Sequence, residues 1–305
     1  MAILNIKLAG IEFTNPIMTA SGTFGYGKEY SQFYPLSKLG AVMVKGISPK
    51  PVNGNPVPRI CETSCGMLNA IGLQNPGVDS FINDENYLPF LKKSDTKIIV
   101  NIWGKSVEDY IYVAERMNEA KGVDALEINI SCPNIKEGGI AFGTDLKQAS
   151  FVVAEIRKVT TLPLITKLSP NVTKISDFAK AVVDSGTDMI SMINTLTGMA
   201  IDIETRRPKL ANITGGLSGP AIKPIAIKMI HDVYKAVTVP IIGMGGVFTY
   251  ADAVEMMLAG ASAVAVGTAN FSNPYAPIEI LEGLKSYMKK HNIKHASELV
   301  GAVNY

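Results

Sequence analysis

The fold is decided by residues 164–192, which read LITKLSPNVTKISDFAKAVVDSGTDMISM. Residues 164–167 and 189–192 are short apolar runs typical of buried strands, whereas residues 175–185 place apolar side chains at a helical spacing. A strand, a helix and a second strand in this order predict one βα unit of a parallel sheet.

The same pattern recurs along the whole chain. Amphipathic stretches between several apolar runs predict helices at residues 106–120, 146–159, 175–185, 222–236 and 250–259. The predicted strands are residues 16–19, 41–44, 97–100, 125–128, 164–167, 189–192, 240–243 and 263–266. Eight such units predict an α/β fold of the (β/α)8 TIM-barrel type.

Two long connections interrupt this repeat, at residues 46–96 and 196–219, and both are rich in Gly, Pro and Asn. Long structured insertions are usually functional, so we expect them at the top of the barrel. No Pro/Gly/Ser-rich linker or charge run divides the chain, which predicts a single domain over residues 1–305.

Composition narrows the class of ligand. A hydrophobic fraction of 47% can build a sizeable core, yet no apolar run approaches the roughly 18 residues that span a bilayer. The first residues lack a signal-peptide pattern, so we expect a cytosolic protein. A net charge of +2 is too small to indicate nucleic acid or an anionic membrane as partner. Small molecules are the expected ligands.

The cysteines are few. Cys61, Cys65 and Cys132 fit a reducing compartment, and three thiols cannot supply the four ligands of an iron–sulfur cluster. We expect no metal site in this chain.

Unusual residues stand where the predicted strands end. In a barrel of this kind the carboxyl ends of the strands carry the chemistry. Any one of these residues could be a simple cap or turn, but that explanation fails for all of them together. They are Ser21, Lys45, Gly46, Asn101, Asn129, Cys132, Lys167, Asn194, Thr195, Gly245, Gly246, Gly267 and Thr268.

The last two units predict a phosphate site. Gly245-Gly246 and Gly267-Thr268 precede predicted helices, and glycine amides at such positions bind phosphate. Position 248 is Phe248 where a dinucleotide fingerprint needs glycine, so nicotinamide binding by this chain is not expected. Lys45 and Lys167, at the ends of two predicted strands, would add positive charge to the same end of the barrel. This inventory suits a flavin mononucleotide (FMN) stacked against a small, flat, anionic substrate.

Cys132 lies in the motif NISCPN, directly after the strand at residues 125–128. Asn129 and Asn134 flank this thiol and could hold a planar substrate against it, which indicates a catalytic base or nucleophile. A small buried residue that closes a strand is the alternative.

Five segments together resemble the dihydroorotate dehydrogenases over nearly the whole chain. They are NPIMTASG at 15–22, MLNAIGLQN at 67–75, NISCPN at 129–134, GIAFGTD at 139–145 and GGLSGPAIKP at 215–224. The resemblance implies a (β/α)8 barrel that holds FMN at its top. Cysteine at 132 resembles the cytosolic class 1 enzymes, since the membrane-associated class uses serine and carries an N-terminal extension.

Residues 71–77 and 215–224 resemble type 1B, the NAD-linked form. This resemblance implies a second, electron-transfer subunit with FAD and a 2Fe-2S cluster, and a homodimer of catalytic chains within a heterotetramer. It further implies that Cys132 removes the C5 proton of (S)-dihydroorotate while the C6 hydride passes to the flavin. The product would be orotate, in de novo pyrimidine (UMP) biosynthesis.

The resemblance also assigns binding roles. Positions that match FMN contacts are Ser21, Lys45, Gly46, Asn101, Asn129, Lys167, Ile193, Gly219, Gly245, Gly246, Gly267 and Thr268. Positions that match substrate contacts are Lys45, Asn69, Ala70, Ile71, Gly72, Leu73, Asn129, Asn134, Asn194 and Thr195.

Two residues depart from the family pattern. Trp103 stands where a small residue is usual. Burial in the core is the favoured interpretation, and a role as an anchor for the partner is the alternative. Cys65 stands where serine is common.

Four other functions remain open. A type 1A homodimer would pass its electrons to fumarate, and the chain could also be a different FMN-dependent barrel oxidoreductase. A flavin-free lyase would form a Schiff base on Lys167, and a non-catalytic protein would only bind FMN.

Overall fold

A closed barrel of eight parallel strands forms the centre of the computed structural model, which describes residues 2–130 and 142–304. The strands are β3 (Ile17–Thr19), β4 (Ala41–Ile47), β7 (Lys97–Ile102), β8 (Ala125–Asn129), β9 (Leu164–Lys167), β10 (Met189–Met192), β15 (Ile241–Gly243) and β16 (Ala263–Val266). They neighbour one another in chain order, and β16 closes the barrel on β3. The structure confirms the predicted fold class and all eight strands.

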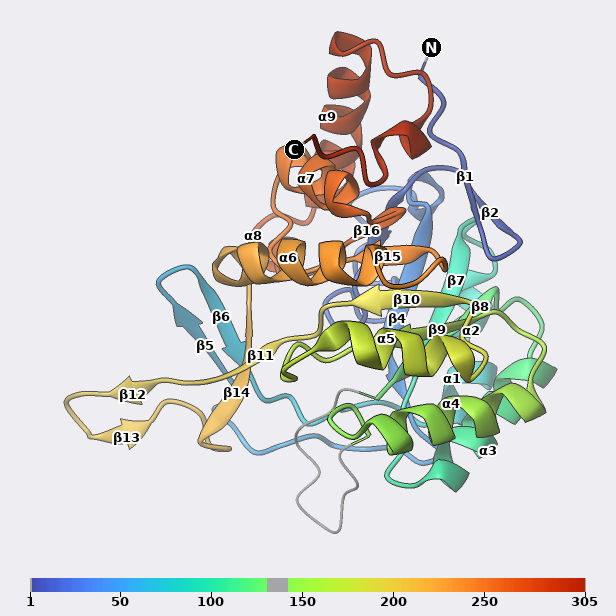
Figure 1. The fold of residues 1–305 in the computed structure, drawn as a ribbon. Coiled ribbons are helices and arrows are strands. Elements are labelled where there is room, and N and C mark those ends of the chain that lie inside the picture. The colour runs from blue at the N-terminus through green and yellow to red at the C-terminus, as the bar shows by residue number, and fades with distance from the viewer. Residues whose placement is uncertain (1, 131–141, 305) are drawn as a thin grey trace.

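Helices cover the outside of the barrel (Figure 1). Their apolar faces pack on strands that are themselves buried on both sides, which explains why those strands read as continuous apolar runs. The five predicted helices are α3 (Val107–Glu119), α4 (Leu146–Val159), α5 (Ile175–Asp184), α6 (Lys223–Tyr234) and α7 (Tyr250–Ala259). A sixth long helix, α9 (Ala276–Lys290), follows the Gly267-Thr268 segment, where a helix was expected but its bounds were not predicted.

Short elements complete the chain. A hairpin of β1 (Ile6–Leu8) and β2 (Ile11–Phe13) precedes the barrel. The short helices are α1 (Val78–Asn83), α2 (Leu88–Leu91), α8 (Ala269–Ser272) and the 3-10 turns η1 (Leu36–Lys38), η2 (Pro220–Ile222) and η3 (Ala296–Leu299). None of the helices in the described ranges is both long enough and apolar enough to cross a membrane.

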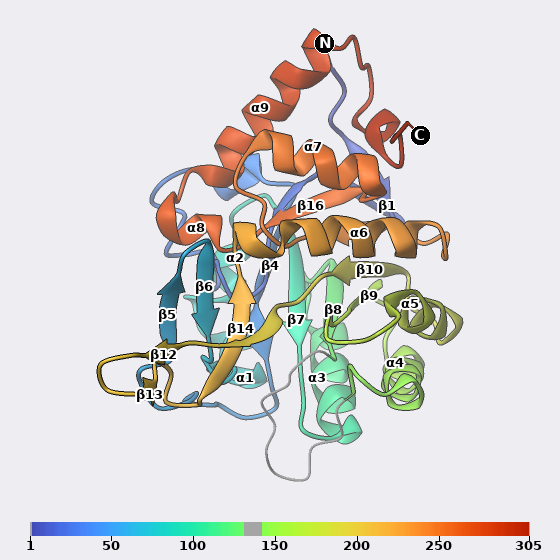
Figure 2. The same ribbon diagram turned by 60° about the vertical axis from the view of Figure 1, so that its left-hand side comes forward.

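The two insertions build one structure together. The first supplies β5 (Ile60–Thr63) and β6 (Gly66–Asn69), and the second supplies β11 (Leu196–Met199) and β14 (Thr214–Ser218). They form a single antiparallel sheet in the order β11-β14-β6-β5. Figure 2 shows β5, β6 and β14 side by side beneath α8 and α6. Segments that are far apart in the sequence therefore share one wall, which the sequence pattern did not predict.

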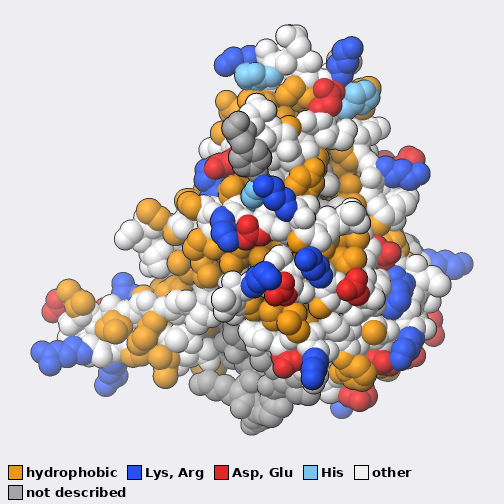
Figure 3. Space-filling view, viewed as in Figure 1, with side chains coloured by type: hydrophobic (Ala, Val, Ile, Leu, Met, Phe, Trp, Pro, Cys, Tyr) orange, Lys and Arg blue, Asp and Glu red, His pale blue; other side chains and the backbone are white. Residues whose placement is uncertain are grey.

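A small hairpin projects from this sheet. Its strands, β12 (Ile201–Asp202) and β13 (Arg207–Pro208), stand away from the barrel at the left of Figure 1. Ile203 at its tip is 82% exposed. Elsewhere on the face drawn in Figure 3, Lys and Arg side chains are interspersed with Asp and Glu.

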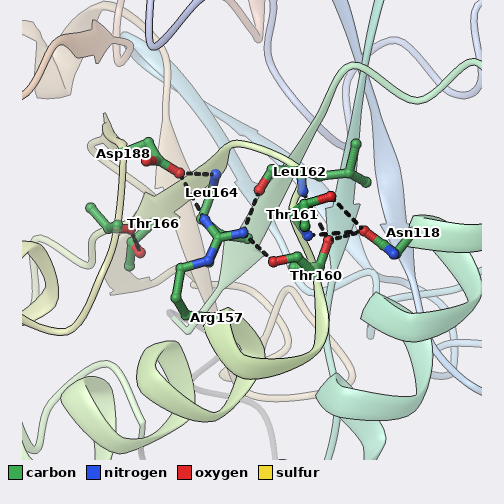
Figure 4. A network of polar contacts seen from close by, with 9 residues as sticks. Asn118, Arg157, Thr160, Thr161, Leu162, Leu164, Thr166 and Asp188 are labelled. Carbon is green, nitrogen blue, oxygen red and sulfur yellow. Dashed lines mark hydrogen bonds and ion pairs between the residues drawn. The ribbon is translucent and has the colours of Figure 1, made fainter.

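A polar network ties the amino ends of two barrel strands to the helices outside (Figure 4). The Arg157 guanidinium, on α4, donates to Asp188 Oδ2 at 3.0 Å, to the Leu162 carbonyl oxygen at 2.9 Å and to the Thr160 carbonyl oxygen. Asn118 Oδ1, on α3, accepts from Thr160 Oγ1 at 2.8 Å. This network lies at the end of the barrel that serves stability, opposite the end that carries chemistry.

Candidate active site at the carboxyl ends of the strands

A cavity of about 1120 Å³ opens at the carboxyl ends of the barrel strands. The barrel supplies one side through Ser21, Lys45, Asn101 and Lys167, and the antiparallel sheet supplies the opposite wall through β5, β6 and β14. Ligand pockets usually measure roughly 300–1,000 Å³, so this cavity has room for a cofactor and a small substrate together.

The cavity brings together all twelve residues predicted to contact FMN. Eight of the ten predicted substrate positions line it as well. Those eight are Lys45, Asn69, Ile71, Gly72, Leu73, Asn129, Asn194 and Thr195. Cys132 and Asn134 lie outside the described residues.

Ala70 is the one described residue of the predicted substrate set that does not line the cavity. It is 1% exposed and packs with Leu68 and Leu210 in a small core under the sheet. Side chains of an extended segment alternate between its two faces, so Asn69 and Ile71 reach the cavity and the methyl group of Ala70 points away from it.

Glycines hold the loops after β14 and β15 close together. Gly246 has a φ of +82°, and a Cβ there would lie 2.7 Å from Lys223 Cβ and 3.0 Å from the Gly219 carbonyl oxygen. Only glycine fits such a left-handed, crowded position. Nearby, Thr268 Oγ1 donates to Ser218 Oγ at 2.8 Å, and both residues line the cavity. Glycine backbone and hydroxyls in one place form a donor set suited to a phosphate group.

An ion pair braces this glycine loop from behind. Lys223 Nζ lies 2.7 Å from Asp252 Oδ1 and 2.7 Å from Glu255 Oε2. Asp252 Oδ2 in turn accepts from the backbone amides of Phe248 at 3.0 Å and Thr249 at 2.7 Å. Burial alone would raise the pKa of Asp252, but the hydrogen bonds from Lys223 and these neighbours bring it below its usual value.

The opposite part of the cavity carries cations and amides. Lys167 Nζ donates to Ser21 Oγ at 3.1 Å, and Asn101 Nδ2 lies 3.3 Å from the same oxygen. Burial lowers the pKa of Lys45, and the positive charge of Arg59 lowers it further. Two lysines that line one cavity favour an anionic or electron-rich ligand.

Sequence reasoning missed several residues of the site. Glu127 is fully buried on β8 and accepts a hydrogen bond from the Nδ2 atom of Asn101 at 2.5 Å. An acidic residue inside an apolar strand, two positions before Asn129, was the signal that could have found it. Three further residues line the cavity without such a signal in the sequence around them, namely Ser218 on β14, Phe248 after β15 and Phe271 on α8.

The two departures from the family pattern have different locations. Trp103 is 4% exposed and packs against Gly46, where a Cβ would lie 3.0 Å from its ring. It belongs to the core, which confirms the favoured interpretation of burial and excludes the candidate role as a docking anchor. Cys65 is an exposed free thiol at the rim of the cavity.

Taken together, the fold and the cavity define a (β/α)8-barrel enzyme whose ligand site lies at the carboxyl ends of the strands. Residues 3–288 match the family model described as "Dihydroorotate dehydrogenase". The chain belongs to this family of flavin-dependent oxidoreductases.

Individual relatives agree with the family match. The chain is 56% identical to the "Dihydroorotate dehydrogenase B (NAD(+)), catalytic subunit" of Alkaliphilus oremlandii, with 98% of each chain covered. It is 55% identical to the protein of the same name from Geotalea uraniireducens, again over 98% of each. The crystal structure of DHODH in complex with ferulenol from Eimeria tenella superimposes with a TM-score of 0.79 at 25% identity, covering 98% of this chain and 88% of that one.

Proposed function

We propose that this chain is the catalytic subunit of an NAD-linked dihydroorotate dehydrogenase. It would oxidise (S)-dihydroorotate to orotate for pyrimidine biosynthesis, with one FMN bound in a single domain over residues 1–305. The observation that carries the proposal is the convergence of all twelve predicted FMN residues on one cavity. The names of the relatives support the same reaction.

The donor set fits FMN on both of its parts. The glycine loops at Gly219, Gly245 and Gly267, with Thr268, would hold the phosphate group. Ser21, Asn101 and Lys167 would face the ring system. When bound, FMN supplies an acceptor for the hydride.

The substrate would lie between that ring system and the antiparallel sheet. Lys45 would neutralise its carboxylate, and Asn69, Asn194 and Thr195 would hydrogen bond to its amide groups. The sheet, by covering the cavity, would exclude water from the reacting atoms.

Cys132 is the proposed base for the C5 proton. It lies three positions after Asn129, the last residue of β8. General-base catalysis typically contributes about 10²- to 10⁴-fold, so this one thiol should account for most of the rate of flavin reduction.

Electrons would leave through a second subunit with FAD and a 2Fe-2S cluster. This chain has three cysteines, fewer than a cluster needs, and its late glycine motif lacks the third glycine of a dinucleotide site. The words "catalytic subunit" in the relatives' names are consistent with such a partner. The heterotetramer and the cytosolic location stay predictions.

Anaerobic reduction of the bound flavin by dihydroorotate tests the reaction. The purified chain should contain one FMN, and dihydroorotate should bleach it. Cys132→Ala should keep FMN and orotate binding but reduce flavin about 10²- to 10⁴-fold more slowly. Cys65→Ala serves as the matched control thiol. Colourless protein that FMN cannot reconstitute would contradict the proposal, as would bleaching by Cys132→Ala at the unmodified rate.

Parallel turnover assays with NAD, fumarate and an artificial dye test the acceptor. The isolated chain should reduce the dye but neither NAD nor fumarate. Brisk NAD reduction by the chain alone would contradict the need for a partner. Efficient fumarate reduction would move the protein to type 1A, and no turnover with dihydroorotate would leave only the role of FMN binding.

A further inference from the structure

Glu127 is a carboxylate inside the barrel that the proposed reaction does not use. It is 0% exposed, and its two oxygens accept hydrogen bonds from Asn101 Nδ2 at 2.5 Å and from Ser191 Oγ at 2.7 Å. Transfer of a carboxylate from water into a protein interior costs several kcal/mol before its partners compensate. Because its burial is costly and it contacts Asn101 in the cavity wall, we expect Glu127 to have a role beyond packing.

The carboxylate dictates how the amide of Asn101 is turned. An ionised carboxylate only accepts hydrogen bonds, so Asn101 must direct its NH2 group at Glu127. The reversed amide would set its carbonyl oxygen against a carboxylate oxygen at hydrogen-bond distance, which is repulsive. Asn101 Oδ1 is thereby directed to the side of Gly46, 2.7 Å from where a Cβ of that glycine would lie. Gly46 and Asn101 both line the cavity.

The same amide links Glu127 to a cation of the cavity. Asn101 Nδ2 lies 3.3 Å from Ser21 Oγ, and Ser21 Oγ accepts from Lys167 Nζ at 3.1 Å. Hydrogen bonds therefore connect the carboxylate of Glu127 through Asn101 and Ser21 to the ammonium group of Lys167. Three of these four residues line the cavity wall.

We propose that Glu127 is a positioning residue that locks Asn101 with its acceptor oxygen toward the cavity. The occupant would then have to offer a hydrogen-bond donor at this place, and the isoalloxazine ring of a flavin carries a ring N–H group. The negative charge of Glu127 would also oppose the addition of electrons to a nearby ring and so lower its reduction potential. This inference rests on the proposed binding of FMN.

A double-mutant cycle with Glu127→Gln and Asn101→Ala tests the coupling. Glutamine matches the size of glutamate but can turn either end toward Asn101, so the amide is no longer locked. Glu127→Gln should raise the FMN dissociation constant up to about tenfold, which is the upper value of one neutral hydrogen bond. The double variant should bind FMN no more weakly than Asn101→Ala alone, because both changes remove the same interaction.

The reduction potential of the bound flavin is the second readout, since a merely structural role would not move it. It should rise in Glu127→Gln. Thr166→Val is the matched control: Thr166 is fully buried on the neighbouring β9, hydrogen bonds to Thr187 and does not line the cavity. It should lower the stability to urea and leave both FMN affinity and flavin potential unchanged.

The outcomes separate this inference from the proposed function. If the unmodified chain binds no FMN, the proposed function fails. If it binds FMN while Glu127→Gln matches it in affinity and in potential, the role of Glu127 fails alone. Additive losses in the double variant would equally refute action through Asn101.

Discussion

Replacing Gly246 by alanine should damage the phosphate end of the cavity in a measurable way. Gly10, in the turn between β1 and β2, shares its φ of +82° but has no atom within 4 Å of an added Cβ. Both substitutions impose the left-handed strain of about 1–2 kcal/mol on a non-glycine residue. Only Gly246→Ala adds a clash, at 2.7 Å from Lys223 Cβ and 3.0 Å from the Gly219 carbonyl oxygen.

The difference between the two variants isolates that clash. Overpacking of this kind costs about 1–3 kcal/mol, so Gly246→Ala should lose about 3 kcal/mol of unfolding free energy and Gly10→Ala about 1. Urea unfolding of the flavin-free proteins measures both values. Equal losses in the two variants would refute the claim that the loops after β14 and β15 are packed to contact at this point.

Ligand binding gives an independent test of the same substitution. The displaced loop should bind FMN at least about tenfold more weakly, which corresponds to about 1.4 kcal/mol. Riboflavin has the same ring without the phosphate, so its affinity should change little. Fluorescence titration compares the two ligands, and an equal loss for both would show that Gly246 does not serve the phosphate.

Three further predictions concern charge and stability. Arg157→Ala should lower the unfolding free energy by about 2 kcal/mol without changing FMN affinity, because the guanidinium bonds lie at the far end of the barrel; an unchanged urea midpoint would contradict this. Orotate is an anion, and only the ammonium form of Lys45 attracts it. The affinity for orotate should therefore fall as the pH rises through the lowered pKa of Lys45, which lies below the ordinary lysine pKa of about 10.4. Arg59→Gln should move that fall to higher pH in an orotate titration, and no movement would show that Arg59 does not act on Lys45. Asp252→Asn should lower the unfolding free energy by about 2 kcal/mol near neutral pH. This difference from the unmodified protein should shrink as the pH falls through the lowered pKa of Asp252, because protonation removes the same stabilisation from the unmodified protein. Urea unfolding at several acidic pH values measures it, and a difference that does not change with pH would oppose the prediction.

The barrel could be predicted because its signal is local. Each strand is buried on both faces and therefore reads as a continuous apolar run, while each covering helix shows its own spacing. Parallel barrel strands all have their carboxyl ends at the same end of the barrel. Residues as far apart in sequence as Ser21 and Thr268 could therefore be assigned to one site without a structure.

The antiparallel sheet could not be predicted in the same way. Its strands come from two insertions that pair across the molecule, and no local pattern specifies which distant segment a strand will join. The burial of Ala70 beneath the sheet could not be predicted for this reason, because only the pairing of β6 with β14 shows which face of the segment turns to the cavity. Trp103 left a docking role open in the sequence because a large aromatic side chain fits a core and a docking surface, and the structure confirms the favoured interpretation of burial.

The shared sheet has a consequence for the local stability of the molecule. Asn69 and Gly216 face each other across β6 and β14, although 147 positions separate them in the sequence. Barrel strands β8 and β9 are buried at every position, whereas β6 and β14 are partly exposed. Regions with fewer buried contacts open at a lower free energy, so the wall should open before the barrel does in the native protein. Backbone amides of β6 and β14 should then exchange hydrogen faster than those of β8 or β9, and a bound ligand should slow the exchange there selectively.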